Sequence, residues 1–209
     1  MKPGQATTLL LGLVFLLYLA AQLLRRPGET PAESRHLNRL AFLVWIAQGF
    51  GAGSVPFAPG TFGSLVGLLW FALLVSAGNL WLFAIATFAG ICLSVWVCGA
   101  AERILHQTDP GSVVMDEIAA MPLCFWAWIG IRLWHGSTVT DLGAFFSRQH
   151  WPLTLGVLVL FRFFDIVKPW PVHQSQRLPG GWGVTADDLL AAIYVNFVVV
   201  LVYAIRGQL

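Results

Sequence analysis

Long apolar runs constrain this 209-residue chain more than any other feature of its sequence. Six runs are long enough, or nearly so, to cross a lipid bilayer; they lie at residues 7–24, 62–77, 79–99, 118–134, 152–167 and 189–205. A membrane-spanning helix needs about 20 residues, and a helix satisfies its own backbone hydrogen bonds inside lipid. The sequence therefore predicts an all-α fold, a polytopic integral membrane helical bundle of about six transmembrane helices.

Two further segments refine this prediction. The run at 40–50, LAFLVWIAQGF, is too short to span comfortably and is typical of a re-entrant or interfacial helix. The run at 7–24 is predicted to be a span rather than a cleaved signal peptide, because RRPGE follows it without a small-residue cleavage site. Residues 1–38 thus form an additional N-terminal transmembrane helix and a polar linker, and residues 39–209 form the main membrane domain.

The composition agrees with a membrane protein. Hydrophobic residues make up 57% of the chain and charged residues only 11%, whereas a soluble domain carries about a quarter charged residues. A net charge of +2 without a long basic run gives no reason to expect nucleic-acid binding. The three cysteines lie inside apolar runs without a C-x-x-C pair, so they are predicted to be small core residues and not disulfide partners or zinc ligands.

Positive charge predicts which loops face the cytoplasm. The segments 25–61, 100–117 and 168–188 hold seven Lys and Arg residues, and the opposite segments hold four. Cytoplasmic loops carry the excess of positive charge, so the first group is predicted to be cytoplasmic. Two spans separate each of these segments from the next, and all three must therefore share one face in either orientation.

Half of the ten acidic residues gather at the ends of three spans on that same face. These acids are Asp116, Glu117, Asp165, Asp187 and Asp188, and Asp109 lies in the loop before the first pair. Five acids at one interface repel each other, and either raised pKa values or a divalent cation relieves that repulsion. Hard oxygen ligands favour Mg²⁺ or Mn²⁺ over zinc. The alternative for each acid alone is a helix cap at the membrane surface.

The stretch RFFDIVKPWP at 162–171 places two cations beside one of these acids. In a helix, Arg162 and Asp165 lie one turn apart on one face, and Pro169 is predicted to end the helix at Lys168. Arg and Lys both bind phosphate groups. The alternative is an ion pair that only anchors the end of the helix.

Glycine-rich segments fall on the same face. GFGAGSVPFAPGTFGSL at 49–65 leads to Thr61 and Ser64, and PGGWG at 179–183 precedes the Asp187–Asp188 pair. Backbone N–H groups of such segments can bind phosphate at a helix start, although neither contains the G-K-[ST] of a Walker A loop. Each segment alone is typical of a plain turn, but beside the acids the two predict a phosphate pocket.

Four motifs together are similar to those of one family. PGTFGSL at 59–65, DPGSVVMDE at 109–117, RFFDIVKPWP at 162–171 and GGWGVTADD at 180–188 resemble the bacterial phosphatidylglycerophosphatase A family in order and approximate spacing. The resemblance covers residues from about 40 to 205. The chain departs from the family at Ala120 and Thr185, where Gly and Met are common, and these changes affect local geometry without removing a proposed ligand.

The resemblance implies an Mg²⁺-dependent phosphatase of the bacterial inner membrane, with its active site on the cytoplasmic face. Such an enzyme hydrolyses the terminal phosphomonoester of phosphatidylglycerophosphate to phosphatidylglycerol in phospholipid biosynthesis. Its partners are that lipid and the bilayer, and no oligomeric state is predicted. By the resemblance, the catalytic and metal-binding residues are Asp116, Glu117, Asp165, Asp187 and Asp188. The substrate-binding residues are Thr61, Ser64, Asp109, Arg162 and Lys168.

Several alternatives stay open at the level of sequence. Water activated by one of the acids and attack by an aspartate to give an aspartyl-phosphate are both compatible with these residues, as are one or two metal ions. Intramembrane acids also mark ion paths in transporters, but here they gather at one face and the chain lacks an internal repeat. A purely structural membrane subunit would not need the clustered acids.

Overall fold

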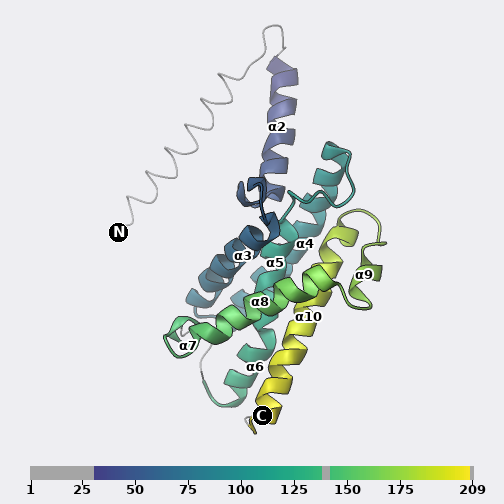
Figure 1. Cartoon of the computed structure of the whole chain (residues 1–209). Helices are drawn as coiled ribbons and strands as arrows, with labels where there is room; N and C mark the ends of the chain where they lie inside the picture. Colours follow the sequence, from purple (N-terminus) through teal and green to yellow (C-terminus); the bar gives the residue numbers. More distant parts are fainter. Residues whose placement is uncertain (1–30, 138–141, 208–209) are drawn as a thin grey trace, which may run out of the picture. The chain divides into compact units, whose positions relative to one another are not determined.

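The computed structural model describes residues 31–137 and 142–207, and this part of the chain is helical throughout, without a strand. Contacts divide the chain into two compact units, residues 1–42 and 43–209. In the first unit, the described residues are the start of helix α2 (Pro31–Ala47), whose Leu37 and Phe42 side chains are exposed. The predicted span at 7–24 lies outside the described residues. Figure 1 shows the chain and its helix labels.

Three helices of the second unit are long and apolar enough to cross a membrane: α3 (Pro59–Ser76), α4 (Leu80–Leu105) and α10 (Gly181–Ile205). They correspond to the apolar runs at 62–77, 79–99 and 189–205. Asn79 caps α4, because its side-chain oxygen accepts a hydrogen bond from the backbone N–H of Leu82 at 3.0 Å. Large apolar side chains such as Leu69, Phe88 and Phe197 are exposed on these helices, as a lipid-facing surface requires.

The remaining predicted spans of this unit have a different form. The run at 118–134 is divided into α5 (Met115–Ala120), the 3-10 helix η2 (Met121–Phe125) and α6 (Trp126–Trp134). Pro122 lacks a backbone N–H, which disfavours a continuous α-helix there. The side chain of Asn196 in α10 compensates, since it accepts from the Ala127 N–H at 2.6 Å and donates to the Leu123 carbonyl at 2.8 Å.

Short elements complete the unit. Helix α8 (Trp151–Val167) has 17 residues and follows α7 (Gly143–Phe146), while η1 (Ala52–Ser54) and α9 (Val172–Ser175) lie in loops. The run at 40–50 is helical only as far as Ala47, where α2 ends, and the turn after it contains three residues with positive φ, at positions 49 to 51. Thus a helical membrane fold with three candidate spans is established, whereas six spans are not.

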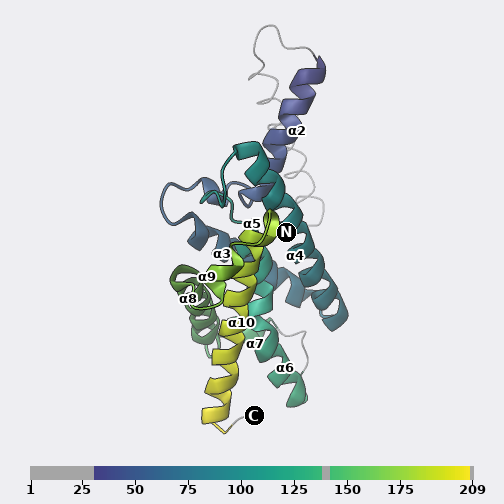
Figure 2. The same cartoon turned by 90° about the vertical axis from the view of Figure 1, so that its right-hand side faces the viewer.

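Aromatic side chains form the larger core. The rings of Phe71 and Phe125 stack with centroids 3.8 Å apart, and Phe145 packs edge-on against Phe71. A smaller apolar cluster, which includes Val97, Val114 and Val184, lies between α4, α5 and α10. Helix α10 packs against both α4 and α8, as Figures 1 and 2 illustrate. This packing brings the start of α10, the end of α8 and the start of α5 together.

Candidate active site

The short helix α5 carries the first acid pair. Asp116 and Glu117 are 6% and 9% exposed, although they lie in the first turn of the helix. The Oδ1 atom of Asp116 accepts a hydrogen bond from the backbone N–H of Glu117 at 3.0 Å. The backbone N–H of Val114, just before the helix, donates to the carbonyl oxygen of Ala47 at 3.0 Å. The acids are therefore held in the protein interior and not at an exposed loop.

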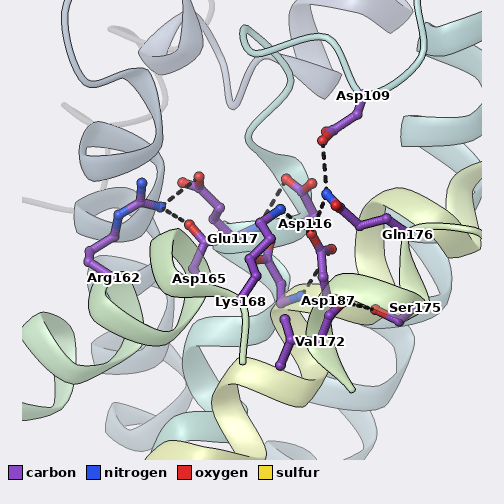
Figure 3. A network of polar contacts seen from close by, with 11 residues as sticks. Asp109, Asp116, Glu117, Arg162, Asp165, Lys168, Val172, Ser175, Gln176 and Asp187 are labelled. Carbon is purple, nitrogen blue, oxygen red and sulfur yellow. Dashed lines mark hydrogen bonds and ion pairs between the residues drawn. The ribbon is translucent and has the colours of Figure 1, made fainter. Parts of the chain in front are cut away.

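Arg162 of α8 joins two acids. Its Nη1 atom lies 2.8 Å from Oε1 of Glu117 and 2.8 Å from Oδ2 of Asp165, one turn further along α8 (Figure 3). The pairing of Arg162 with Asp165 confirms the spacing predicted from the sequence. The second partner, Glu117, is 45 residues away in the chain, and the sequence motif alone does not reveal it.

Lys168 ends α8, as the following proline predicts. It caps the helix with a φ of 45°, and its Nζ lies 2.5 Å from Oδ2 of Asp187 in α10. The motif predicts Asp165 between the two cations, but the ion pair of Lys168 is formed with Asp187. The αL conformation at Lys168 turns the chain away from α8.

The second acid pair lies inside α10. This helix begins at Gly181, so Asp187 and Asp188 are nearly two turns from its start, and both are buried. The helix-cap interpretation of this pair is therefore wrong. Gly181 allows the start of α10 to lie directly against α4, because a Cβ atom there would overlap the carbonyl oxygen of Val95.

The five acids form one electrostatic group. The negative charges of Asp116, Asp165, Asp187 and Glu117 all act on Asp188. If all five are ionised, their charge of −5 is offset by +2 from Arg162 and Lys168, which leaves −3. Such an excess in a buried site requires protons or added cations.

The pKa values of the acid pair of α5 are raised by burial and by the neighbouring negative charges. Burial raises the pKa of Glu117 to about 7, and the favourable charge of Arg162 offsets this only in part. Burial and the neighbouring charge of Glu117 raise the pKa of Asp116 well above its ordinary value. Burial alone would lower the pKa of Lys168, but its hydrogen bond and charge interaction with Asp187 raise it.

A glutamine that the sequence analysis missed connects the outer loop to this group. Nε2 of Gln176 donates to Oδ2 of Asp109 at 3.3 Å and to Oδ2 of Asp187 at 3.1 Å (Figure 3). Asp109 itself is exposed, and its backbone N–H donates to Oε1 of Glu102 at 3.0 Å. An amide in the polar stretch HQSQ carries no sequence signal that distinguishes it from an ordinary loop residue.

The start of α3 packs closely against Glu117 of α5 and Arg162 of α8. A Cβ atom on Gly60 would overlap Oε1 of Glu117, and one on Gly63 would lie 2.5 Å from Oε2 of the same residue. Thr61, between them, is partly buried. Ser64 is fully buried, and its hydroxyl donates to the Gly60 carbonyl at 2.9 Å, so this hydrogen bond uses its proton inside the helix.

The residues present fit a hard divalent cation in donor chemistry. Oε2 of Glu117 is buried without a hydrogen-bond partner in residues 31–137 and 142–207, and the charges of Asp165 and Asp187 act on the same carboxyl group. No three His, Cys, Asp or Glu side chains in those same ranges already converge on a single point where an ion could sit. Ion pairs with Arg162 and Lys168 hold three of the acids instead, namely Glu117, Asp165 and Asp187.

Three apolar helices that are long enough to cross a membrane place the chain in the class of helical membrane proteins. Several buried carboxylates lie among its helices. The family model described as Phosphatidylglycerophosphatase A matches residues 45–203. The chain therefore belongs to the phosphatidylglycerophosphatase A family, and it is a phosphatase. The matched region contains all five acids and both cations of the site.

Two curated relatives of the same name support this membership, and a third relative carries a different name. The phosphatidylglycerophosphatase A of Haemophilus influenzae is 34% identical over 83% of this chain and 96% of its own length. The enzyme of the same name from Escherichia coli is 30% identical over 71% of this chain and 76% of its own length. A Bacteroides thetaiotaomicron protein, provisionally named a phosphatidylinositol-3-phosphatase, is 37% identical over 79% of this chain and 96% of its own length. No solved structure shows significant similarity to the chain.

Proposed function

We propose that this protein hydrolyses the terminal phosphomonoester of phosphatidylglycerophosphate, which gives phosphatidylglycerol and phosphate in phospholipid biosynthesis. The observation that carries the proposal is the buried group of five acids with two cations in a member of this family. Phosphoryl transfer depends mainly on positioning and on neutralising charge. A site with both anionic and cationic side chains, assembled from separate helices, meets these needs.

The cofactor we propose is Mg²⁺, held by Asp116, Glu117, Asp165, Asp187 and Asp188. When bound, such an ion neutralises phosphoryl oxygens and lowers the pKa of a water molecule. The excess negative charge of the five acids supports this choice. Arg162 and Lys168 are then available to bind the phosphate through their N–H groups.

Glu117 is the acid best suited to move a proton. Its pKa of about 7 lies near the working pH, where a general base is most effective. We propose that Oε2 accepts the proton of the attacking water while Arg162 holds Oε1 in place. Gln176 orients Asp187, because it contacts that carboxylate and Asp109 together.

We further propose that the protein lies in the bacterial inner membrane with this site on the cytoplasmic face. The excess of Lys and Arg in the segments that surround the site supports this orientation. A second candidate substrate is a phosphatidylinositol phosphate, because the name of the Bacteroides thetaiotaomicron relative refers to that lipid. Both candidates are membrane lipids with a phosphomonoester on a polyol headgroup.

Phosphate release by the detergent-purified full chain tests the proposal. The protein is assayed on phosphatidylglycerophosphate and on phosphatidylinositol-3-phosphate, with Mg²⁺ and with EDTA. We expect faster release from phosphatidylglycerophosphate, no release in EDTA, and a loss of at least about 100-fold for Asp165→Ala, as is typical when a charged catalytic group is removed. Glu102→Ala removes an acid outside the group and should retain activity.

The alternatives give distinct results. Preferential release from the inositol lipid would keep the site and change the substrate. Normal release by Asp165→Ala, or full activity of a metal-free preparation, would contradict the proposed site.

A further inference from the structure

An apolar groove of about 400 Å³ lies between α3, α4 and α5. Leu69 and Trp70 of α3 form one side of the groove, and Gly90 and Leu93 of α4 form another. Ile118 and Ala119 of α5 also line it. The helix that carries the acids Asp116 and Glu117 is therefore also a wall of this groove.

The two sides of α5 have opposite character. Met115, Ile118 and Ala119 are spaced so that they share one face of the helix, and all three line the groove. Asp116 and Glu117 occupy the positions between them and contact the polar group of the site. A phosphate at the acids and a hydrocarbon chain in the groove are thus separated by about the width of one helix, roughly 10 Å.

The far end of the groove lies about one membrane leaflet away from the level of the acids. On α3, Gly63 is at the level of Glu117, and Leu73, which lines the groove, is ten residues further along the helix. Ten residues at a rise of 1.5 Å correspond to about 15 Å, which is half of the hydrocarbon thickness of about 30 Å.

We propose that this groove binds one acyl chain of the lipid substrate while the phosphate of the same molecule lies among the acids. The inference rests on the proposed function, because it assigns the apolar end of that substrate. Two other grooves are lined by the start of α4 with α6 and by the start of α8 with the end of α10. Neither includes a residue of α5, the helix that carries Asp116 and Glu117.

Glycines in the three grooves permit a matched test. An added Cβ atom on Gly90 would meet only Nε1 of Trp70, at an ordinary 3.9 Å. Gly130 and Gly156 line the two other grooves and have no atom within 4 Å of an added Cβ. Leucine favours a helix over glycine, so Gly90→Leu adds an apolar side chain to the proposed site, and Gly130→Leu and Gly156→Leu are its controls.

The measurement is the competition of two phosphatidylglycerophosphates, one long-chain and one short-chain, in the same mixed micelles with Mg²⁺. We expect Gly90→Leu to lower the ratio of kcat/KM for the long chain over that for the short chain about tenfold, which corresponds to about 1.4 kcal/mol. The two control variants should keep the wild-type ratio. An unchanged ratio for Gly90→Leu would overturn the inference.

A binding readout separates this inference from the proposed function. A phosphatidylglycerophosphate analogue with a photoreactive group at the end of one acyl chain is cross-linked to the full chain and mapped by mass spectrometry. Cross-links concentrated on the groove of Gly90 and Leu93 would support the inference. They would do so even if the wild type released no phosphate, because the absence of phosphate release contradicts only the proposed function. Equal labelling of all three grooves would indicate ordinary surrounding lipid. Occupation of the groove by a second copy of the chain, or by residues 7–24, would also overturn the inference.

Discussion

Glu117 is subject to two opposing electrostatic effects, the burial of its carboxyl group and the positive charge of Arg162. One of its carboxylate oxygens pairs with Arg162, while burial raises the pKa of the carboxyl group to about 7. The protonated form is therefore favoured in the folded protein at a pH where an exposed glutamate is ionised. This single side chain links the stability of the protein to pH.

We expect the metal-free protein to lose stability as the pH rises from about 4.5 to about 7. In this window the folded state binds more protons at Glu117 than the unfolded state does, so the free energy of unfolding falls, by at most about 1.4 kcal/mol per pH unit for one group. Asp116 changes stability in the same direction, because its pKa is also raised. Thermal unfolding in detergent with EDTA at a series of pH values measures the slope.

Glu117→Gln serves as the control for this effect, because it removes the titrating group and keeps its shape. The slope between pH 4.5 and 7 should decrease in that variant. A wild-type protein that becomes more stable over the same window would show that Glu117 is stabilised as a carboxylate and that its folded-state pKa is not raised.

The contact between α3 and α5 is the element-scale feature that shapes the site. Gly60, Gly63 and Gly67 lie along one face of α3, and each is too close to α5 or its partners to accept a side chain. The helix backbone itself thereby closes one side of the acid group. This arrangement explains why a glycine-rich stretch here belongs to a helix, although its composition alone is typical of a turn.

Gly60→Ala should impair both stability and turnover. Its Cβ atom would overlap Oε1 of Glu117 and lie 2.7 Å from Nη1 of Arg162, so α3 or the ion pair must shift. We expect a loss of about 1–3 kcal/mol in the free energy of unfolding and of about 100-fold in turnover, since small displacements of catalytic groups are costly. Phosphate release and thermal unfolding in detergent measure the two effects.

Gly156→Ala in α8 is the matched control, because open space surrounds the added Cβ atom there. It should behave like the wild type in both measurements. If Gly60→Ala also behaved like the wild type, the close contact between α3 and the Glu117–Arg162 ion pair would be contradicted.

At the same scale, the sequence predicts some helix boundaries well and misses others. Pro169 fixes the end of α8, and the one-turn spacing gives the Arg162–Asp165 pair. The start of α10 is missed by eight residues, because an apolar run cannot reveal that Asp187 and Asp188 face the interior of a site. The contacts Glu117–Arg162 and Asp187–Lys168 depend on packing between distant helices, and sequence spacing does not encode them.

At the scale of the whole molecule, the three long apolar helices are predictable because membrane spans follow from hydropathy. The division of the run at 118–134 into three helices is not predictable from hydropathy. The hydrogen bonds at the division are completed by Asn196, a polar residue of another helix. Ligands that bridge several helices should therefore stabilise the fold as a unit.

We expect Mg²⁺ together with vanadate to raise the unfolding temperature of the protein more than Mg²⁺ alone. A ligand that binds only the folded state at 100 times its Kd adds about 2.7 kcal/mol, which amounts to several degrees for a chain of this size. Asp188→Ala should lose the protection, and Glu102→Ala should retain it. Protection by Mg²⁺ without any further effect of vanadate would indicate an ion site that does not bind phosphate, as a transporter would have.

The distribution of the site along the chain also determines when it comes into existence during synthesis. Asp116 and Glu117 lie in α5, their partner Arg162 is in α8, and Asp187 and Asp188 are in the final described helix, α10. A nascent chain that has inserted only its first helices holds two buried acids without Arg162 or Lys168. Helix α10 must enter the membrane before the acids are complete, so an incompletely translated protein lacks the full group of five acids.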